Sequence, residues 1–476
     1  MLEYSSIAQY HSALQEGQTT CAQTVEEYLA RIESCRQLNA FVEVFAEEAR
    51  TRARVLDQQR RSGQPTSRLH GVILGIKDVI CYKDHRVSAA SRILSGFTSI
   101  YSATAVQRLI DEGAIIIGNL NCDEFAMGST SENSVYGRVR NAHDESRVPG
   151  GSSGGSAVAI QAGLCMVTLG TDTGGSVRQP ADFCGIIGLK PTYGRVSRYG
   201  LIAYASSFDQ IGIFGNNIAD VALTLEIISG PDDFDSTVAH RPAPAISDLP
   251  AKGKKHRIAF FKEALDHPSL DPEISTAIQG LVKTLRLQGH DVVPVAFDLL
   301  DYIVPAYYIL TTAEASSNLS RFDGIRYGYR TSRATDDLTT FYELNRSEGF
   351  GKEVKRRIML GTFVLSTGYY DAYFTRAQKV RNLLVQKLRL IFNDFDYIIL
   401  PTSPATAFRA GEKTEDPIAM YLADIYTVMA NLTGVPGISV PLFRHSNGMR
   451  FGLQVMAAPF NELPLLGFAD ELIQGI

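Results

Sequence analysis

Residues 164–180 read LCMVTLGTDTGGSVRQP, an apolar run that leads directly into a glycine-rich turn. Short apolar runs of this kind are typical of buried strands, and two more occur at 71–76 (GVILGI) and 114–118 (AIIIG). A helical pattern, TAVQRLIDEG at 104–113, separates two of these runs. This alternation predicts an α/β fold in which helices cover both faces of a mixed sheet.

The segments that flank this region extend the prediction. Residues 1–66 predict helices, because Thr24 and Glu27 have the spacing of a capping box and 44–61 reads as a charged surface helix. After a proline-rich break, the pattern strand, helix, strand at 258–297 indicates one more unit of the same sheet. Two further strands are expected at 396–400 and 438–443.

The bulk composition excludes several classes of protein. The chain has 476 residues, is 45% hydrophobic and carries a net charge of −5, which gives no basic footprint for nucleic acid. No apolar run reaches the length of a membrane span, and the N-terminal sequence does not have the pattern of a signal peptide. The six cysteines form no CxxC pair, so we expect no metal site, no disulfide framework and a cytoplasmic location.

Three glycine-rich motifs could carry chemistry: GIKD at 75–78, PGGSSGGSA at 149–157 and GTDTGGSVR at 170–178. Glycines let a backbone turn sharply and expose its N–H groups to an anion or oxyanion. A phosphate-binding P-loop is excluded, because no Gly-Lys-Ser/Thr triplet occurs. A nucleophile elbow at 150–154 is disfavoured, because no strand precedes it and His445 is the only late histidine.

A serine nucleophile with a lysine base remains. Ser176 follows a predicted strand, Lys77 could act as a base if burial keeps it neutral, and Ser152 could relay a proton between them. The N–H groups offered to an oxyanion belong to Thr173, Gly174, Gly175 and Ser176. The alternative is a plain turn and a lysine that snorkels to solvent, and the motifs alone leave both interpretations open.

Taken together, the three motifs resemble the amidase signature family, whose lysine–serine–serine spacing they match: 75 positions separate Lys77 from Ser152, and 24 more lead to Ser176. The resemblance implies a single α/β/α domain around a mixed, twisted sheet. It implies that Ser176 is the nucleophile, that Ser152 is the bridging serine after a cis peptide bond, and that Lys77 is the base. The implied domain covers 1–476, with N-terminal helices at 1–66, a signature core at 70–212, and the remaining sheet, helices and pocket elements at 257–476.

Longer segments narrow the resemblance within the family. Residues 121–137, 314–328, 355–381 and 421–441 resemble the glutamine-hydrolysing subunits of tRNA-dependent amidotransferases. Such a subunit forms a γ-glutamyl ester and supplies ammonia to a partner within a heterotrimer of A, B and C subunits. The B subunit holds most of the misacylated tRNA and uses ATP and Mg²⁺ to amidate Glu-tRNA(Gln), and in some cases Asp-tRNA(Asn). The resemblance implies no cofactor in this chain.

Glutamine is a zwitterion, so its pocket needs a cation and an anion. By resemblance, Arg357 binds the carboxylate and Asp424 binds the α-amino group, with further contacts from Tyr308, Gly128 and Ser129. Two alternatives stay open: a free-standing amidase for another small amide, and a non-catalytic scaffold subunit. Arg178 and Asp209 also match charged positions of the family, and a structural ion pair explains them equally well.

Overall fold

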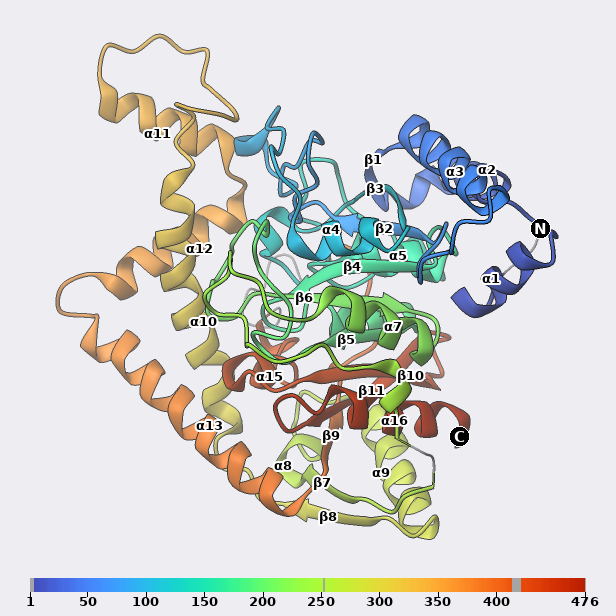
Figure 1. Ribbon diagram of the computed structural model, residues 1–476. Coiled ribbons are helices and arrows are strands. Elements are labelled where there is room, and N and C mark those ends of the chain that lie inside the picture. Colours follow the sequence, from blue (N-terminus) through green and yellow to red (C-terminus); the bar gives the residue numbers. More distant parts are fainter. Residues whose placement is uncertain (1–3, 251–252, 413–420, 476) are drawn as a thin grey trace.

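A mixed sheet of eleven strands organises the computed structural model, which describes residues 4–250, 253–412 and 421–475 (Figure 1). The strands lie in the order β1-β3-β2-β4-β6-β5-β10-β11-β9-β7-β8. Their bounds are β1 (Phe41–Val44), β2 (Ile73–Lys77), β3 (Ile115–Leu120), β4 (Val167–Asp172), β5 (Ile187–Lys190), β6 (Gln210–Gly215), β7 (Arg257–Phe261), β8 (Asp291–Val295), β9 (Tyr397–Pro401), β10 (Gly437–Arg444) and β11 (Arg450–Ala457). The predicted α/β fold with a mixed sheet is confirmed.

Helices surround this sheet. Their bounds are α1 (Ile7–Gln15), α2 (Cys21–Ser34), α3 (Ala46–Arg61), α4 (Thr104–Asp111), α5 (Gly154–Gln161), α6 (Arg178–Cys184), α7 (Ile218–Ile228), α8 (Lys262–Leu265), α9 (Pro272–Leu287), α10 (Leu300–Asn318), α11 (Leu338–Gly349), α12 (Lys352–Leu365), α13 (Arg376–Asp394), α15 (Val428–Thr433) and α16 (Glu462–Gly475). A short π-helical turn, η6 (Asp371–Thr375), leads into α13. No helix in the described part of the chain is both long and apolar enough to cross a membrane.

Three neighbouring parallel strands, β3, β2 and β4, form the part of the sheet that positions the predicted site. The chain passes from β2 through α4 to β3 and then returns across β2, through α5, to β4. Because parallel crossovers are right-handed, these opposite directions of travel place α4 and α5 on opposite faces of the sheet. Both faces of β2, β3 and β4 are therefore covered, and every residue of these strands is buried.

The N-terminal prediction is wrong in two details: the helix cap near residue 20, and Val44, which belongs to a strand and not to the helix predicted over 44–61. α2 begins at Cys21, and its N-cap is Thr20, whose side chain accepts a hydrogen bond from the N–H of Gln23. Thr24, the predicted cap, is fully buried inside the helix and shares a hydrogen bond with the Thr19 hydroxyl. The short strand β1 was not predicted either, because its four residues are enclosed by helical patterns and pair only with the distant β3.

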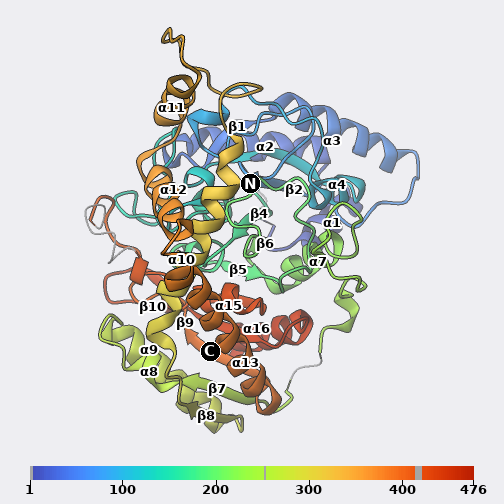
Figure 2. The same cartoon turned by 90° about the vertical axis from the view of Figure 1, so that its left-hand side faces the viewer.

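The second half of the chain continues the same sheet. β7 pairs in parallel with both β8 and β9, as the predicted strand–helix–strand unit requires. Beside the sheet, α12 and α13 each pack against α10, and the turn that joins them protrudes at the left of Figure 1; these two helices and the segment between them are called the hairpin. The view in Figure 2 looks onto this hairpin. The contact with α10 is close at Gly361, where a Cβ atom would lie 1.9 Å from the carbonyl oxygen of Thr312.

Candidate active site

The candidate site lies where β2 and β4 end. Lys77 is the last residue of β2 and Asp172 is the last residue of β4, and the loop that contains Ser176 follows directly. Because these strands are parallel, both ends open at the same edge of the sheet, where open α/β sheets bind their ligands. The exposed fraction of the side chains is 0% at Lys77 and Ser152 and 8% at Ser176.

Lys77 is surrounded by hydroxyl groups. Its Nζ lies 2.7 Å from Ser152 Oγ, 2.9 Å from Ser153 Oγ and 2.9 Å from Thr171 Oγ1. Burial lowers the pKa of Lys77 to about 8 and outweighs the attraction of the Asp123, Asp172 and Asp209 carboxylates, which acts in the opposite direction. A substantial fraction of the lysine is therefore neutral near pH 8.

The hydroxyl groups also define which way the hydrogen bonds can run. Ser153 Oγ donates to the carbonyl oxygen of Thr171 at 3.0 Å, so its oxygen is free to accept from Lys77. A neutral amine has two hydrogens and one lone pair. If the hydrogens go to Ser153 and Thr171, the lone pair faces the Ser152 hydroxyl, which is the direction a proton relay needs.

The segment before Ser152 is tightly enclosed. The Gly151–Ser152 peptide bond is cis, as the family resemblance implies. The N–H of Gly151 donates to Gln179 Oε1 at 3.1 Å. A Cβ atom at Gly151 would lie 2.3 Å from Asp123 Oδ2 and 2.6 Å from the backbone nitrogen of Thr130, so this position has no room for a side chain.

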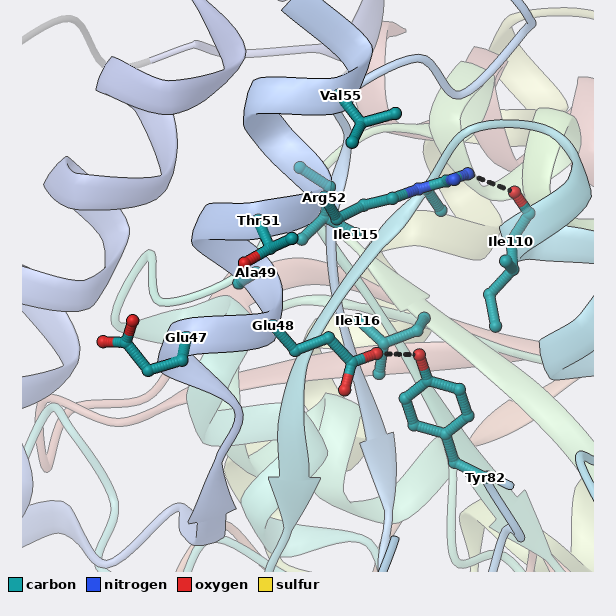
Figure 3. A pocket seen from close by; sticks show the side chains of 11 residues that line it. Glu47, Glu48, Ala49, Thr51, Arg52, Val55, Tyr82, Ile110, Ile115 and Ile116 are labelled. Carbon is teal, nitrogen blue, oxygen red and sulfur yellow. Dashed lines mark hydrogen bonds between the residues drawn. The ribbon is translucent and has the colours of Figure 1, made fainter. Parts of the chain in front are cut away.

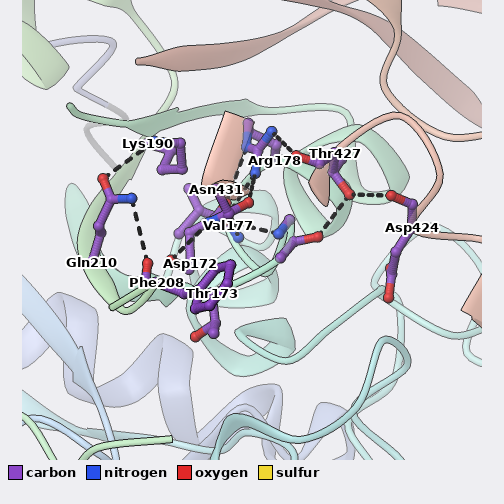
Figure 4. Close-up of polar contacts among 12 residues, drawn as sticks. Asp172, Thr173, Val177, Arg178, Lys190, Phe208, Gln210, Asp424, Thr427 and Asn431 are labelled. Atoms are coloured by element: carbon purple, nitrogen blue, oxygen red, sulfur yellow. Dashed lines mark hydrogen bonds and ion pairs between the residues drawn. The ribbon is translucent and has the colours of Figure 1, made fainter. Parts of the chain in front are cut away.

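The turn before Ser176 is held by a carboxylate (Figure 4). Asp172 accepts hydrogen bonds from the backbone N–H groups of Gly175 at 2.8 Å and Val177 at 3.1 Å. The prediction that the Gly175 N–H faces an oxyanion is therefore wrong, because Asp172 occupies that donor. Among the described residues, no hydrogen bond outside the regular helices and strands engages the N–H groups of Thr173, Gly174 or Ser176, which stay predicted oxyanion donors.

Arg178 anchors this carboxylate rather than Asp209. Its Nη2 lies 2.9 Å from Asp172 Oδ1, and both side chains are fully buried. Arg178 also donates to the carbonyl oxygen of Thr427 and to Asn431 Oδ1, which ties the turn to α15 and the loop before it (Figure 4). Asp209 instead accepts from Thr173 Oγ1 at 2.6 Å, so the two acidic side chains hold neighbouring parts of the same turn.

The residues predicted to bind glutamine lie together on the other side of the turn. Asp424 accepts from Ser129 Oγ at 3.0 Å and from the Tyr308 hydroxyl at 2.9 Å. Burial raises the pKa of Asp424 to about 6. Tyr307, the neighbour of Tyr308, packs over the turn, since a Cβ atom at Gly174 would lie 2.3 Å from its hydroxyl oxygen.

Arg357 is buried, not exposed as its basic surroundings in the sequence would indicate. Its Nε donates to Glu353 Oε1 at 2.9 Å and its Nη1 donates to the Tyr204 hydroxyl at 2.9 Å. The guanidinium carbon lies 5.3 Å from the centre of the Tyr308 ring and 5.9 Å from that of Tyr421. Aromatic faces and one carboxylate thus keep this cation charged inside the protein.

A cavity of about 100 Å³ joins these groups. It is lined by Gly128, Ser129, Thr130, Glu132, Asn133, Tyr308, Lys352, Glu353, Arg356, Arg357 and Tyr421. Asp424 is not part of the lining but reaches it through its bonds to Ser129 and Tyr308. A small cavity that is lined by a buried cation and linked through Ser129 and Tyr308 to a buried carboxylate matches a small zwitterion.

A larger cavity, of about 530 Å³, lies elsewhere, between α3 and β3 (Figure 3). Its polar groups are already engaged: Glu48 binds the Tyr82 hydroxyl, and Arg52 donates to the carbonyl oxygen of Ile110. None of the predicted site residues lines it. Size alone therefore does not identify the candidate active site in this molecule.

Several residues of the site were missed by sequence reasoning. Ser153 could have been suspected as a neighbour of Ser152, and Glu353 stands four positions before Arg357, the spacing of a helical ion pair. Asp172 and Asn431 carry no local signal, because their contact spans 259 positions of the chain. Within the described residues, no cluster of three or more histidine, cysteine, aspartate or glutamate side chains could hold a metal ion.

The sequence of this chain is similar to the sequences of known proteins. The model of the Amidase family matches residues 23–466. The A subunit of the glutamyl-tRNA(Gln) amidotransferase of Chlorobium luteolum is 50% identical over 477 residues, covering 99% of this chain and 97% of that protein. The protein of the same name from Koribacter versatilis is 49% identical over 466 residues, covering 97% of this chain and 96% of that protein.

Solved structures with a similar fold also include an amidotransferase A subunit and an amidase. The crystal structure of the A subunit of glutamyl-tRNA(Gln) amidotransferase from Thermotoga maritima has a TM-score of 0.77 and 38% identity, covering 94% of this chain and 89% of that chain. The peptide amidase from Stenotrophomonas maltophilia has a TM-score of 0.83 and 28% identity, covering 99% of this chain and 96% of that chain. The chain is thus similar in fold both to a peptide amidase and to one component of an amidotransferase.

Proposed function

This chain belongs to the amidase family, and from that premise we propose that it is the glutamine-hydrolysing subunit of a tRNA-dependent amidotransferase. The observation that carries the proposal is a buried cation that lines one small cavity together with a buried carboxylate that bonds two of its lining residues. Arg357 supplies the cation for a substrate carboxylate, and Asp424 supplies the anion for an α-ammonium group. A free-standing amidase that acts on an uncharged amide has no need of both.

The chemistry begins at the turn after β4. Ser176 Oγ attacks the side-chain amide carbon of glutamine, and its proton passes through Ser152 to neutral Lys77. The N–H groups of Thr173, Gly174 and Ser176 stabilise the negative charge that develops on the amide oxygen. The C–N bond then breaks, the leaving nitrogen takes the proton back along the relay, and ammonia departs. Water hydrolyses the γ-glutamyl ester on Ser176 to give glutamate.

The contact that supports this relay is the 2.7 Å separation of Lys77 Nζ and Ser152 Oγ in a fully buried setting. Burial favours the uncharged form of the amine, and the surrounding hydroxyl groups satisfy its hydrogen bonds without a counter-ion. A lysine in this environment can accept a proton near neutral pH, which an exposed lysine cannot do efficiently.

The proposal extends to the complex. The ammonia passes to a partner, the B subunit, which amidates Glu-tRNA(Gln), and in some systems Asp-tRNA(Asn), using ATP and Mg²⁺. A C subunit completes a cytoplasmic heterotrimer. Names of the relatives support this assembly, since each is the A subunit of an amidotransferase.

The test is Ser176→Ala in the assembled complex. We expect glutamine-dependent amidation to fall by about 10⁴-fold or more, since members of such a relay act as a unit. Amidation supplied with ammonium chloride should be retained. The matched control is Ser156→Ala, which alters a buried serine of the same glycine-rich motif; within the described part of the chain its hydroxyl bonds only the Leu169 carbonyl oxygen. Glutaminase activity that survives Ser176→Ala would overturn the proposal.

A further inference from the structure

One face of α12 is not covered by any other part of the described chain. The opposite face packs against α10 through Val354, Gly361 and Val364, which are buried. Spacing of three and four residues places Lys352, Arg356, Met359 and Phe363 together on the outer side. The last two are large apolar side chains with exposed fractions of 72% and 42%.

Aromatic side chains extend this face around the tip of the hairpin. Leu360, Tyr369, Tyr370 and Tyr373 are also exposed. The rings of Phe363 and Tyr369 have centroids 4.4 Å apart, and Tyr373 lies 5.9 Å from Phe363. We call Met359, Leu360, Phe363, Tyr369 and Tyr373 the hairpin patch. Contiguous exposed apolar surface of this kind marks an interaction site.

Charge distinguishes the hairpin from the rest of the molecule. Nine basic and two acidic residues lie between Lys352 and Arg389, in a chain whose net charge is −5. Five of the basic residues are exposed and form no ion pair with a described residue: Lys352, Lys355, Arg376, Lys379 and Arg389. A partner that covers the patch and extends along α12 and the beginning of α13 would meet this unpaired positive charge, so its own rim is expected to be acidic.

We propose that the hairpin patch is the docking surface for the protein subunit that receives the ammonia, and that this subunit presents an apolar centre with an acidic rim. The partner's role as the acceptor of ammonia rests on the proposed function. The location of the docking surface rests on the exposed side chains of the hairpin. Methionine, aromatic and arginine side chains are enriched at protein interfaces, and all three occur here.

The position of the patch fits this partner. Lys352 and Arg356, at the beginning of the same helix face, line the cavity that contains Arg357. A subunit that binds along the outer face of α12 therefore reaches from the hairpin tip to the cavity. Docking there would place the acceptor of ammonia beside the group that binds glutamine.

RNA is the less favourable occupant. Single-stranded nucleic acid uses aromatic rings as platforms for stacked bases. Here the rings of Phe363, Tyr369 and Tyr373 contact one another, and Met359 and Leu360 offer no ring at all. The apolar centre suits the desolvated core of a protein interface better than a stacking surface.

The experiment measures the affinity of the full-length chain for purified B and C subunits by titration calorimetry. The double variant Met359→Asp/Phe363→Asp should weaken binding at least about 30-fold, since charges would be buried at the centre of the interface. The matched control is Leu287→Asp, which changes an apolar residue that is 90% exposed on α9 and should leave the affinity within threefold. Glutaminase activity of the isolated double variant should equal that of the unaltered chain.

A second variant tests the rim without altering the apolar centre. Arg376→Glu/Lys379→Glu should slow association several-fold, and the effect should shrink as salt is raised. The proposal is overturned if both double variants bind the subunits like the unaltered chain. It is equally overturned if assembly is unchanged but tRNA binding falls, or if only self-association of the chain, seen by sedimentation, is lost. Because binding is measured without turnover, these results are independent of whether Ser176→Ala abolishes glutaminase activity.

Discussion

Arg178 and Asp172 form a fully buried ion pair beneath the glycine-rich turn, with Nη2 2.9 Å from Oδ1 and Nε 3.1 Å from Oδ2. The same carboxylate accepts the N–H groups of Gly175 and Val177. Burial alone would raise the pKa of Asp172, but the charge and hydrogen bonds of Arg178 hold it well below its usual value. One side chain therefore connects a charge in the core to the backbone that presents Ser176.

Removing the cation should destabilise the protein strongly. Arg178→Met leaves Asp172 charged, buried and unpaired, which we expect to cost about 3–5 kcal/mol of unfolding free energy. The control is Arg50→Met, which removes an arginine from the exposed carboxylates Glu26 and Glu47 and should cost far less, because solvent screens such surface pairs. Urea denaturation followed by circular dichroism measures both, and equal losses would contradict the prediction.

The same pair predicts a dependence on pH. The pKa of Asp172 is depressed in the folded state, so the stability it contributes is fully present above the unfolded pKa of about 4. That contribution is lost as pH falls from about 4 toward the folded pKa. The difference in stability between the unaltered chain and Arg178→Met should therefore narrow below pH 4, and a constant difference would exclude the ion pair as its source.

The pH dependence of catalysis should report Lys77. Its pKa of about 8 lies below the ordinary lysine value, and the base must be neutral, so kcat should rise about tenfold between pH 7 and pH 9. Lys190 is a second buried lysine, with a pKa that burial lowers to about 7. Among the described residues its Nζ donates hydrogen bonds only to the Pro191 carbonyl oxygen and to Gln210 Oε1, the latter shown in Figure 4. The rise near pH 8 should persist in Lys190→Met, whereas Lys77→Met should be inactive at every pH.

The central strands and the site turn could be predicted from local sequence. Apolar runs bounded by glycine located β2, β3 and β4, because a strand buried on both faces is mostly apolar. β5 and β6 were missed: β5 has only four residues, and both strands contain glycine, which is typical of turns.

The contacts that the site residues make with one another and with distant residues could not be predicted from local sequence. The sequence predicted Gly175 as an oxyanion donor, but its N–H donates to Asp172. Which N–H groups of the turn face Asp172 depends on the turn conformation, and the sequence does not specify that conformation. The burial of Arg357 depends on Tyr204 and Tyr421, which lie on distant segments of the chain. The charged neighbours of Arg357 in the sequence predict an exposed side chain. Only the packing of distant segments in the folded protein buries it.

Arg357 should be more sensitive to substitution than its neighbour. Arg357→Lys removes the planar group that faces the aromatic rings and can bind a carboxylate with two hydrogen bonds, so KM for glutamine should rise at least about tenfold. Arg356→Lys is the matched control, because Arg356 binds the other oxygen of Glu353 and its side chain is 39% exposed. Comparable increases in KM for both variants would show that Glu353, not the substrate, is the main partner of Arg357.

Asp424 provides a test that separates binding from chemistry. Burial raises its pKa to about 6, and only the ionised carboxylate attracts an ammonium group, so KM for glutamine should rise about tenfold as pH falls from 7 to 5. Asp424→Asn should have a high KM that does not change over this range. Burial also raises the pKa of Asp209 to about 6, but that residue holds Thr173 and its protonation should alter kcat. A KM that still rises toward pH 5 in Asp424→Asn would assign the α-amino group to another partner.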